Sequence, residues 1–380
     1  MKIGINAYPL SRKFSGPSVY LFNVLKYLEI MDKENEYYLY SRNGLKLPFT
    51  NNPRWHIIIT EGFLNYSSTL WMLTALKKRA LKDKIDIFWG TENVLPLNLP
   101  KIVKKVLTVH DLVWYYYPEV LNWDNSIILP LFAKRSIEVS DHIITISHSI
   151  VDEIKKEFKV PSEDLSVIYL GVSDKFKHLD QEESSEFIAK KHNVSNDYIL
   201  FVGNIEPKKN LLNLLKAFKI FTQKFSLKHQ LLLVGSKRYN SSGIYKTYKK
   251  LKFTLKEAAF LDCVDFQDLP YFYSGAKLFI MPSFYEGFGL PPLEAMACGT
   301  PIVASDIPVF REILGDAALL VDPFAPEKIA NAIYRVLTDN ALAKVLTQKG
   351  IERIKQFSWE TTAKETLGIF EKIIKRKNND

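Results

Sequence analysis

Two glutamates spaced eight residues apart, Glu286 and Glu294, form the most informative pattern in the sequence. Glu286 opens the loop Glu-Gly-Phe-Gly-Leu after an apolar run, and two prolines then begin a predicted helix that contains Glu294. Glycines let a backbone approach a phosphate closely, and the N–H groups of such a loop and helix start attract an anion. A carboxylate in the first helical turn can bind vicinal hydroxyls. One glutamate alone could equally be a helix cap, but the whole stretch 279–305 favours a binding site.

A second candidate anion site follows the predicted strand that ends at Gly203. Lys208, Lys209 and Asn210 stand where the next helix begins. Two ammonium groups beside a helix N-terminus suit a phosphate or another anion. Two surface lysines are the alternative, but lysine opposes the helix dipole at this end, so we favour the anion site.

Gly16 and His110 are two further candidates, in the first half of the chain. Gly16 stands before a predicted helix and could bring backbone N–H groups to a ligand, although a simple turn glycine explains it as well. His110 follows the predicted strand 105–109. A neutral imidazole there could position a hydroxyl or move a proton, or could be structural. The phosphate loop of ATPases, G-x-x-x-x-G-K-[ST], is absent from the sequence.

Metal chemistry is not expected. The other six histidines are scattered, Cys263 and Cys298 lie 35 residues apart, and the sequence contains no D-x-D. Without a metal, lysines, backbone N–H groups and helix dipoles would have to stabilise a developing negative charge.

Short apolar runs alternate with amphipathic stretches along the chain, which predicts parallel sheets covered on both faces. The alternation restarts after a polar segment, so we expect two doubly wound α/β domains with ligands at the carboxyl ends of their strands. In the second half we expect a mostly helical stretch over 243–260 and a strand at 264–266. The expected division is an N-terminal domain, a linker, a C-terminal domain and a final helix returning to the N-terminal domain: 1–176, 177–196, 197–356 and 357–380.

Composition excludes several classes of protein. Hydrophobic residues make up 47% of the 380 residues and charged residues 24%, which is incompatible with a mainly disordered chain. Two cysteines cannot form a disulfide scaffold, no run is long enough for a transmembrane helix, and the start reads as a strand, so we expect a cytoplasmic protein. The net charge of +9 divides into +3 for residues 1–176 and +6 for 177–380. This evenly divided positive charge suits binding to an anionic ligand or an anionic membrane surface, or it reflects only a solvated basic surface. It argues against a protein that binds nucleic acid, which would more often concentrate its charge in one patch.

The sequence resembles glycosyltransferase family 4, whose members are retaining enzymes with the GT-B fold. The spacing of Glu286 and Glu294 matches the E-x7-E signature of that family. The resemblance extends over nearly the whole chain, in the segments SGPSVY (15–20), TVHDL (108–112), TISHSI (145–150), FVGNIEPKKNL (201–211) and FSW (357–359).

The resemblance implies a nucleotide-diphosphate sugar as co-substrate, with no cofactor, and implies a role for each candidate residue. Glu294 would hold the ribose and Glu286 the transferred sugar. Lys209 would hold the diphosphate together with Lys208, since Asn204 stands where some members have an arginine. His110 would line the active site near the acceptor. The remaining donor contacts would come from Gly16, Gly203, Asn210, Phe288, Gly289 and Leu290.

The donor would be UDP-glucose or GDP-mannose, with a slight preference for UDP-glucose, and the acceptor a saccharide, free or lipid-linked, in surface polysaccharide synthesis. The stretch 70–84 carries five cations and could rest on the inner face of a membrane, although an ordinary helix packed on the sheet explains it better. Two alternatives remain: a sugar-nucleotide epimerase of the same fold, and a basic protein that binds nucleic acid.

Overall fold

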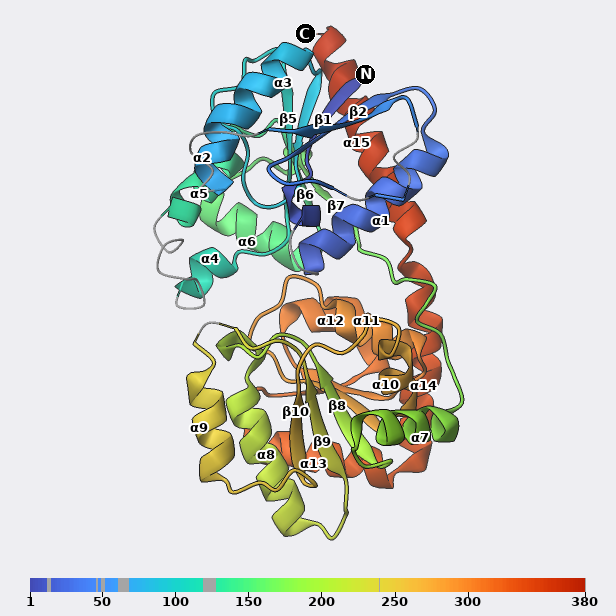
Figure 1. Ribbon diagram of the computed structural model, residues 1–380. Helices are drawn as coiled ribbons and strands as arrows, with labels where there is room; N and C mark the ends of the chain where they lie inside the picture. Colours follow the sequence, from blue (N-terminus) through green and yellow to red (C-terminus); the bar gives the residue numbers. More distant parts are fainter. Residues whose placement is uncertain are drawn as a thin grey trace. The chain divides into compact units, whose positions relative to one another are not determined.

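The computed structural model describes residues 1–11, 15–45, 47–48, 52–60, 68–118, 128–238 and 240–379 (Figure 1). The chain divides into two compact units. The first contains Met1–Tyr116, the stretch that ends at Gly171, and the C-terminal segment from Ser358; the second contains Val172–Phe357. A short segment that begins at Tyr117 also belongs to the second unit, and the chain returns to the first unit for its last helix.

A parallel sheet of seven strands forms the centre of the described part of the first unit. Its order is β3-β2-β1-β4-β5-β6-β7, so the strand order reverses between β1 and β4. The strands are short; the inner ones are almost wholly buried, as expected where helices cover both faces of a sheet, and the outermost strands β3 and β7 are only partly buried. The strands are β1 (Lys2–Asn6), β2 (Glu36–Ser41), β3 (Trp55–Ile59), β4 (Ile87–Gly90), β5 (Lys104–Val109), β6 (His142–Thr145) and β7 (Leu165–Val167).

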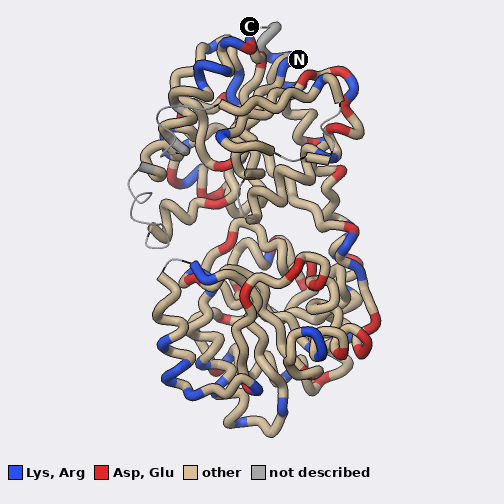
Figure 2. Tube along the Cα trace, viewed as in Figure 1, with Lys and Arg blue, Asp and Glu red and all other residues tan. Residues whose placement is uncertain are grey.

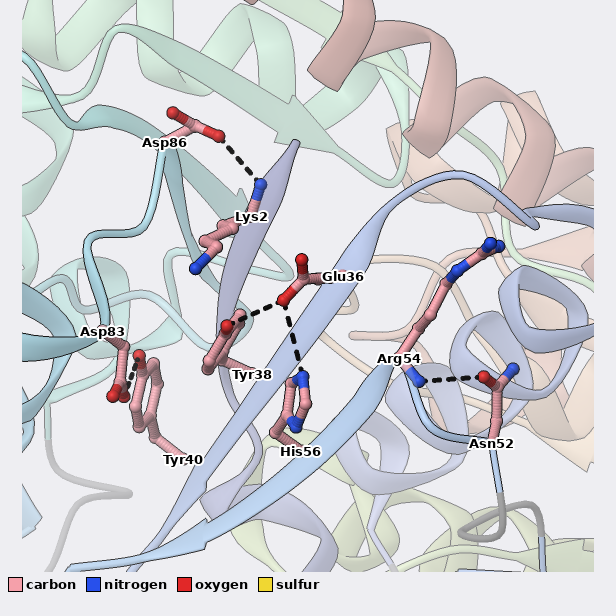
Figure 3. A network of polar contacts seen from close by, with 9 residues as sticks. All are labelled: Lys2, Glu36, Tyr38, Tyr40, Asn52, Arg54, His56, Asp83 and Asp86. Carbon is pink, nitrogen blue, oxygen red and sulfur yellow. Dashed lines mark hydrogen bonds and ion pairs between the residues drawn. The ribbon is translucent and has the colours of Figure 1, made fainter.

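Polar contacts connect the first strands of this sheet to their neighbours (Figure 3). The backbone N–H of Lys2 donates to the Asp86 carboxylate at 2.8 Å, which joins β1 to the segment before β4. The Tyr38 hydroxyl donates to Glu36 at 2.8 Å, and His56 Nε2 lies 3.5 Å from the same carboxylate. These charged groups are thus engaged in holding the strands together.

Helices flank the first sheet, and the last helix of the chain is one of them. Tyr20 on α1 and Trp359 at the start of α15 have ring centroids 6.4 Å apart, and Phe370 of α15 packs on Trp89 of β4. A Cβ atom added to Gly171 would lie 2.1 Å from the Trp359 nitrogen, so only glycine permits this approach. The α-helices are α1 (Gly16–Met31), α2 (Ser68–Trp71), α3 (Lys77–Asp83), α4 (Val113–Tyr116), α5 (Ile128–Val139), α6 (His148–Phe158) and α15 (Trp359–Asn379).

The cationic stretch 70–84 forms the end of α2, a π-helical turn (Met72–Leu76) and α3. Its apolar side chains Trp71, Leu76 and Ala80 are fully buried within the first unit. This burial favours the ordinary packed helix over a membrane-bound one. Among the described residues, no helix is long and apolar enough to cross a membrane.

The second unit contains, among its described residues, a parallel sheet of six strands in the order β10-β9-β8-β11-β12-β13. The order reverses between β8 and β11, as in the first sheet between β1 and β4. The strands are β8 (Tyr198–Val202), β9 (Gln230–Val234), β10 (Ala258–Leu261), β11 (Leu278–Met281), β12 (Ile302–Ser305) and β13 (Leu319–Val321). Two Rossmann-like sheets confirm the α/β fold class predicted from the alternating pattern.

Two local predictions in this unit were wrong. The stretch 243–260 is not mostly helical, because α9 ends at Lys250 and 258–261 forms strand β10. Lys252 has a left-handed φ of 52°, and the N–H of Thr254 donates to the Glu257 carboxylate at 2.8 Å, so the chain turns there. The expected strand at 264–266 is absent from the described structure.

Helices also flank the second sheet. Helix α7 lies in the segment predicted to be a linker and packs on α10. The helices are α7 (Gln181–His192), α8 (Leu211–Lys224), α9 (Ser242–Lys250), α10 (Leu269–Gly275), α11 (Leu290–Ala297), α12 (Pro308–Leu314), α13 (Pro326–Thr338) and α14 (Asn340–Arg353).

Candidate active site

The reversal of strand order in the second sheet brings two loops together. The loop after β8 carries Lys209 and the loop after β11 carries Glu286, and their strands are neighbours. Lys209 Nζ donates to Glu286 Oε1 at 2.6 Å, and the Ser283 hydroxyl donates to the same oxygen at 2.6 Å. Ligands of open α/β sheets bind at such a reversal, outside the carboxyl ends of the strands. The structure thus places two of the predicted site residues in direct contact.

Glu286 is ionised despite its burial. Burial alone would raise its pKa, but the charges of Lys209 and Lys208 and the hydrogen bonds to the carboxylate outweigh it, so the pKa lies below its ordinary value. Lys208 Nζ itself lies 3.9 Å from Glu206 Oε1. Two ammonium groups therefore stand close to one strongly held carboxylate, and a diphosphate would compete with Glu286 for Lys209.

Asn210 fixes the loop that carries the two lysines. It adopts the left-handed conformation, φ 58°, at the start of α8, and it is almost completely buried. Its Nδ2 donates to the carbonyls of Pro282 and Pro323 at 2.9 and 2.7 Å, which ties the loop to the ends of β11 and β13. The structure shows a positioning role for Asn210, and its contact with a donor stays a prediction.

Gly203 lies where the backbones after β8 and β9 come close together. A Cβ atom on Gly235, at the end of β9, would lie 2.0 Å from the Gly203 carbonyl oxygen. A Cβ atom on Gly203 would lie 3.7 Å from Lys209 Cε. The backbone of Gly203 therefore lies beside the lysine side chain and is partly exposed, so a phosphate bound by Lys209 could approach it closely.

The start of α11 presents backbone rather than side chains. Gly289 has a φ of 104°, and a Cβ atom there would lie 2.8 Å from Phe310 Cε1. The Phe288 ring is buried and packs edge-on against Phe357, with 5.8 Å between ring centroids. Leu290 is the first helical residue. Of these residues, the N–H groups are therefore the groups that could bind an anion at the helix start, and their contact with a donor stays a prediction.

Glu294 is the fifth of the eight residues of α11, so it lies in the second helical turn and not in the predicted first turn. Its side chain is partly accessible. The Tyr273 hydroxyl donates to its Oε2 at 2.6 Å. Burial raises the pKa of Glu294 to about 7, and the hydrogen bond from Tyr273 only partly offsets this. Hydroxyl donors would stabilise the ionised form, so this carboxylate is suited to bind a diol.

His110 lies in the first unit, at the end of β5. Its Nε2 is 2.9 Å from the Thr91 carbonyl, and its ring meets the Tyr20 ring edge-on at 4.9 Å. Because a carbonyl only accepts, Nε2 carries the proton and Nδ1 of the neutral ring is an acceptor. Burial lowers the pKa of His110, although the Thr91 carbonyl and nearby carboxylates act against it. A neutral histidine with a free acceptor lone pair can orient a hydroxyl or take its proton.

Gly16 is the first residue of α1, after a capping box formed by Ser15 and Ser18. A Cβ atom at Gly16 would meet no described atom within 4 Å, so the helix start is open to solvent at this point. The helix N-terminus could thus accept an anion. Among the described residues, His, Cys, Asp and Glu side chains form no group of three that could hold a metal ion; independence from metal stays a prediction.

Sequence reasoning missed Ser283 and Tyr273, the hydroxyl partners of the two glutamates. Ser283 is the second residue after β11 and stands three residues before Glu286, and this position was a usable signal. Tyr273 belongs to α10 and is 21 residues from Glu294, so nothing local to the signature pointed to it.

Family models match both halves of the chain. Residues 14–176 match the model described as Glycosyltransferase Family 4, and residues 182–353 match the one described as Glycosyl transferases group 1. The O-antigen chain mannosyltransferase B of Escherichia coli is 31% identical over 77% of this chain and 76% of its own length. The O-antigen chain mannosyltransferase RfbU of Salmonella typhimurium is 34% identical over 63% of this chain and 62% of its own.

Solved structures agree with the fold. Sucrose-phosphate synthase from Thermosynechococcus elongatus has a TM-score of 0.78 at 20% identity, covering 99% of this chain and 100% of its own. HepE from Anabaena, in complex with UDP and glucose, has a TM-score of 0.75 at 17% identity, covering 98% and 100%. At these identities the comparison establishes the architecture alone.

Proposed function

Because the chain belongs to the family 4 glycosyltransferases and has their GT-B fold, we propose that it transfers a mannosyl group from GDP-mannose to a saccharide acceptor in surface polysaccharide synthesis. It is a glycosyltransferase. Two relatives named as O-antigen mannosyltransferases favour mannose over the glucose that we slightly preferred from sequence. UDP-glucose is the second candidate donor.

The contact between Lys209 and Glu286 carries this proposal, because it joins the lysine segment 201–211 to the E-x7-E signature at the reversal of strand order. In the proposed donor complex, Glu294 binds the ribose hydroxyls. Lys209, with Lys208, neutralises the diphosphate together with the N–H groups at the start of α11. Glu286, released from part of its contact with Lys209, accepts hydrogen bonds from the transferred sugar.

The proposed reaction retains the configuration at the anomeric carbon. The acceptor hydroxyl attacks on the face from which the diphosphate leaves, and the leaving phosphate oxygen takes the hydroxyl proton. The C1–O bond to phosphate breaks as the new glycosidic bond forms. Lysines and backbone N–H groups stabilise the negative charge that develops on the leaving group. His110, neutral at pH 7, orients the acceptor hydroxyl through Nδ1.

The acceptor in this proposal is a lipid-linked saccharide, reached from the cytoplasmic side of the membrane. The exposed lysines of α3 could contact anionic lipids there, although the buried apolar side of this stretch argues for weak contact only. Vesicles with and without anionic lipid, sedimented with the protein, test this part separately from catalysis.

Thermal unfolding with GDP, UDP and their sugar conjugates tests the donor site before any acceptor is known. A ligand at 100 times its Kd stabilises a protein by about 2.7 kcal/mol. We expect GDP and GDP-mannose to raise the Tm, and Glu294→Ala to abolish the shift. A shift with UDP alone would select UDP-glucose, and no shift with any nucleotide would refute the donor site.

Product analysis then separates transfer from epimerisation. With GDP-mannose and a lipid-linked saccharide, we expect a lengthened saccharide whose new linkage has the α configuration of the donor, measured by NMR. A β linkage would contradict retention. An epimerised nucleotide sugar with no saccharide product would favour the epimerase alternative instead.

A further inference from the structure

The positive charge of this chain is concentrated in one stretch of the second unit. Residues 207–256 contain 13 of the 51 lysines and arginines and no aspartate or glutamate, so the remainder of the chain carries a net charge of −4. The near-even division between the two halves concealed this. Figure 2 shows the basic residues along α9 and the turns that adjoin it. A stretch of 50 residues without a carboxylate is a marked departure from a mixed surface.

Few of these cations have a carboxylate partner within their own unit. Among the described residues, only Lys208, Lys209 and Lys219 of this stretch lie within 4.0 Å of an aspartate or glutamate oxygen. The first two belong to the candidate active site. Most of the others are carried by α8, α9 and the turns at their ends. Their charge is therefore available to an anion from solution.

A hollow of about 780 Å³ opens among these cations. Its lining comes from the segments that lead into β8, β9 and β10, and includes Lys228 and Lys256. Parallel strands begin at one edge of a sheet and end at the other, so this hollow lies at the opposite edge from Lys209. The five residues of β8 alone separate the two edges by about 15 Å. The hollow is thus distinct from the candidate active site.

Several polar groups around the hollow are not engaged by the protein. Lys228, Lys256 and Asn193 make no side-chain hydrogen bond or ion pair with the described residues. Nδ1 of His229 is buried and likewise lacks a described partner. The one carboxylate in the lining, Glu257, accepts hydrogen bonds from Thr254 and faces Lys219 at 4.0 Å, so its charge is largely compensated.

The lining favours a particular class of anion. Two lysines suit a phosphate group, which they bind as point charges. The volume falls within the range of small-molecule sites and exceeds what a phosphate alone would fill. The lining contains no phenylalanine, tyrosine or tryptophan on which a base could stack. Asn193 and Thr222 instead offer amide and hydroxyl groups for sugar hydroxyls. We propose that this hollow binds a phosphorylated sugar, at a site separate from that of the donor.

Calorimetric titration of the full chain with mannose 6-phosphate tests the proposal, with mannose and inorganic phosphate as separate probes. The variant Lys228→Gln/Lys256→Gln removes both cations from the hollow. The matched control Lys249→Gln/Lys250→Gln removes the same charge from the same stretch, at two lysines outside the lining. All four lysines are surface residues, and thermal unfolding checks that both variants fold.

We expect the first variant to bind mannose 6-phosphate at least about tenfold more weakly and the control to bind within about twofold of the original chain. Saturating GDP or UDP should leave the binding unchanged. Absence of binding, equal weakening in both variants, or displacement by a nucleotide would each overturn the proposal. Binding of mannose or of phosphate alone with the same affinity would overturn the assignment to a phosphorylated sugar.

Discussion

Replacing Lys209 by methionine should destabilise the second unit by about 3–5 kcal/mol, because it leaves a buried carboxylate without its cation. The structure supports a value in this range. The side chains of Lys209 and Glu286 are 11% and 8% exposed, and the Nζ–Oε1 distance is 2.6 Å. The Ser283 hydroxyl still donates to the carboxylate, which places the expected loss near the lower end. For a unit of this size the Tm should fall by roughly 10 °C.

The pH dependence of this loss has a definite sign. In the original chain the pKa of Glu286 lies below its ordinary value of 4.5, so its contribution to stability is present above pH 4.5 and is lost as the pH falls through the lower pKa. Without Lys209, burial dominates and raises the pKa above 4.5. Stability is then lost as the pH rises through the raised pKa. The difference between the two proteins should therefore grow as the pH rises from below 4.5 through the raised pKa of the variant.

Urea unfolding followed by circular dichroism over this pH range measures both effects. The exposed Lys252, replaced by methionine, is the matched control for loss of a lysine in the same unit. The double variant Lys209→Met/Glu286→Gln should regain most of the stability and none of the activity, because the buried charge is gone but the diphosphate still lacks its cation. If Lys209→Met unfolds like the control at every pH, the buried ion pair does not exist in solution.

Three further predictions concern the other site residues. Affinity for the donor nucleotide should rise as the pH rises through about 7, which is the raised pKa of Glu294, because ribose hydroxyls bind the ionised carboxylate. Calorimetry should show that the Glu294→Gln variant binds the nucleotide weakly and without this pH dependence. Gly289→Ala should cost about 1–3 kcal/mol in chemical denaturation, because its φ is 104° and the new Cβ would approach Phe310; an unchanged midpoint would contradict the backbone geometry. His110→Phe should lower turnover about 10²–10⁴-fold and leave nucleotide affinity unchanged. In the original enzyme, turnover should fall only at acidic pH, below the lowered pKa of the buried His110 ring. A loss of turnover matched by lost nucleotide binding would show a structural role for His110.

The sequence predicts those site residues whose chemistry is apparent from their immediate neighbours in the chain. Lys209 and Glu286 could each be identified because loop glycines, prolines and lysines at a helix start have their own physical meaning. Their contact could not, because 77 residues separate them and they meet only where β8 and β11 are neighbours. Strand order depends on how helices pack on both faces of a sheet, which no short pattern encodes.

The same distinction applies to the fold. Alternating apolar runs were enough to predict two α/β domains, since buried parallel strands are uniformly apolar. The stretch 243–260 was misjudged because its many lysines suit a helix, whereas the left-handed Lys252 and the pairing of 258–261 with β9 end the helix early. Counting charge by halves hid the basic stretch, since the excess of aspartate and glutamate in the rest of the second half offsets it.

The return of α15 to the first unit has a consequence for the order of events on the ribosome. The first unit is interrupted by Val172–Phe357, so its last helix is synthesised only after the whole second unit. At about 5–20 residues per second, those residues take roughly 10 to 40 s. During that time Tyr20 and Trp89 lack the aromatic partners that α15 provides. The second unit can therefore complete its fold first, although it begins later, and a nascent chain that stops before Trp359 leaves the first unit with an uncovered apolar face.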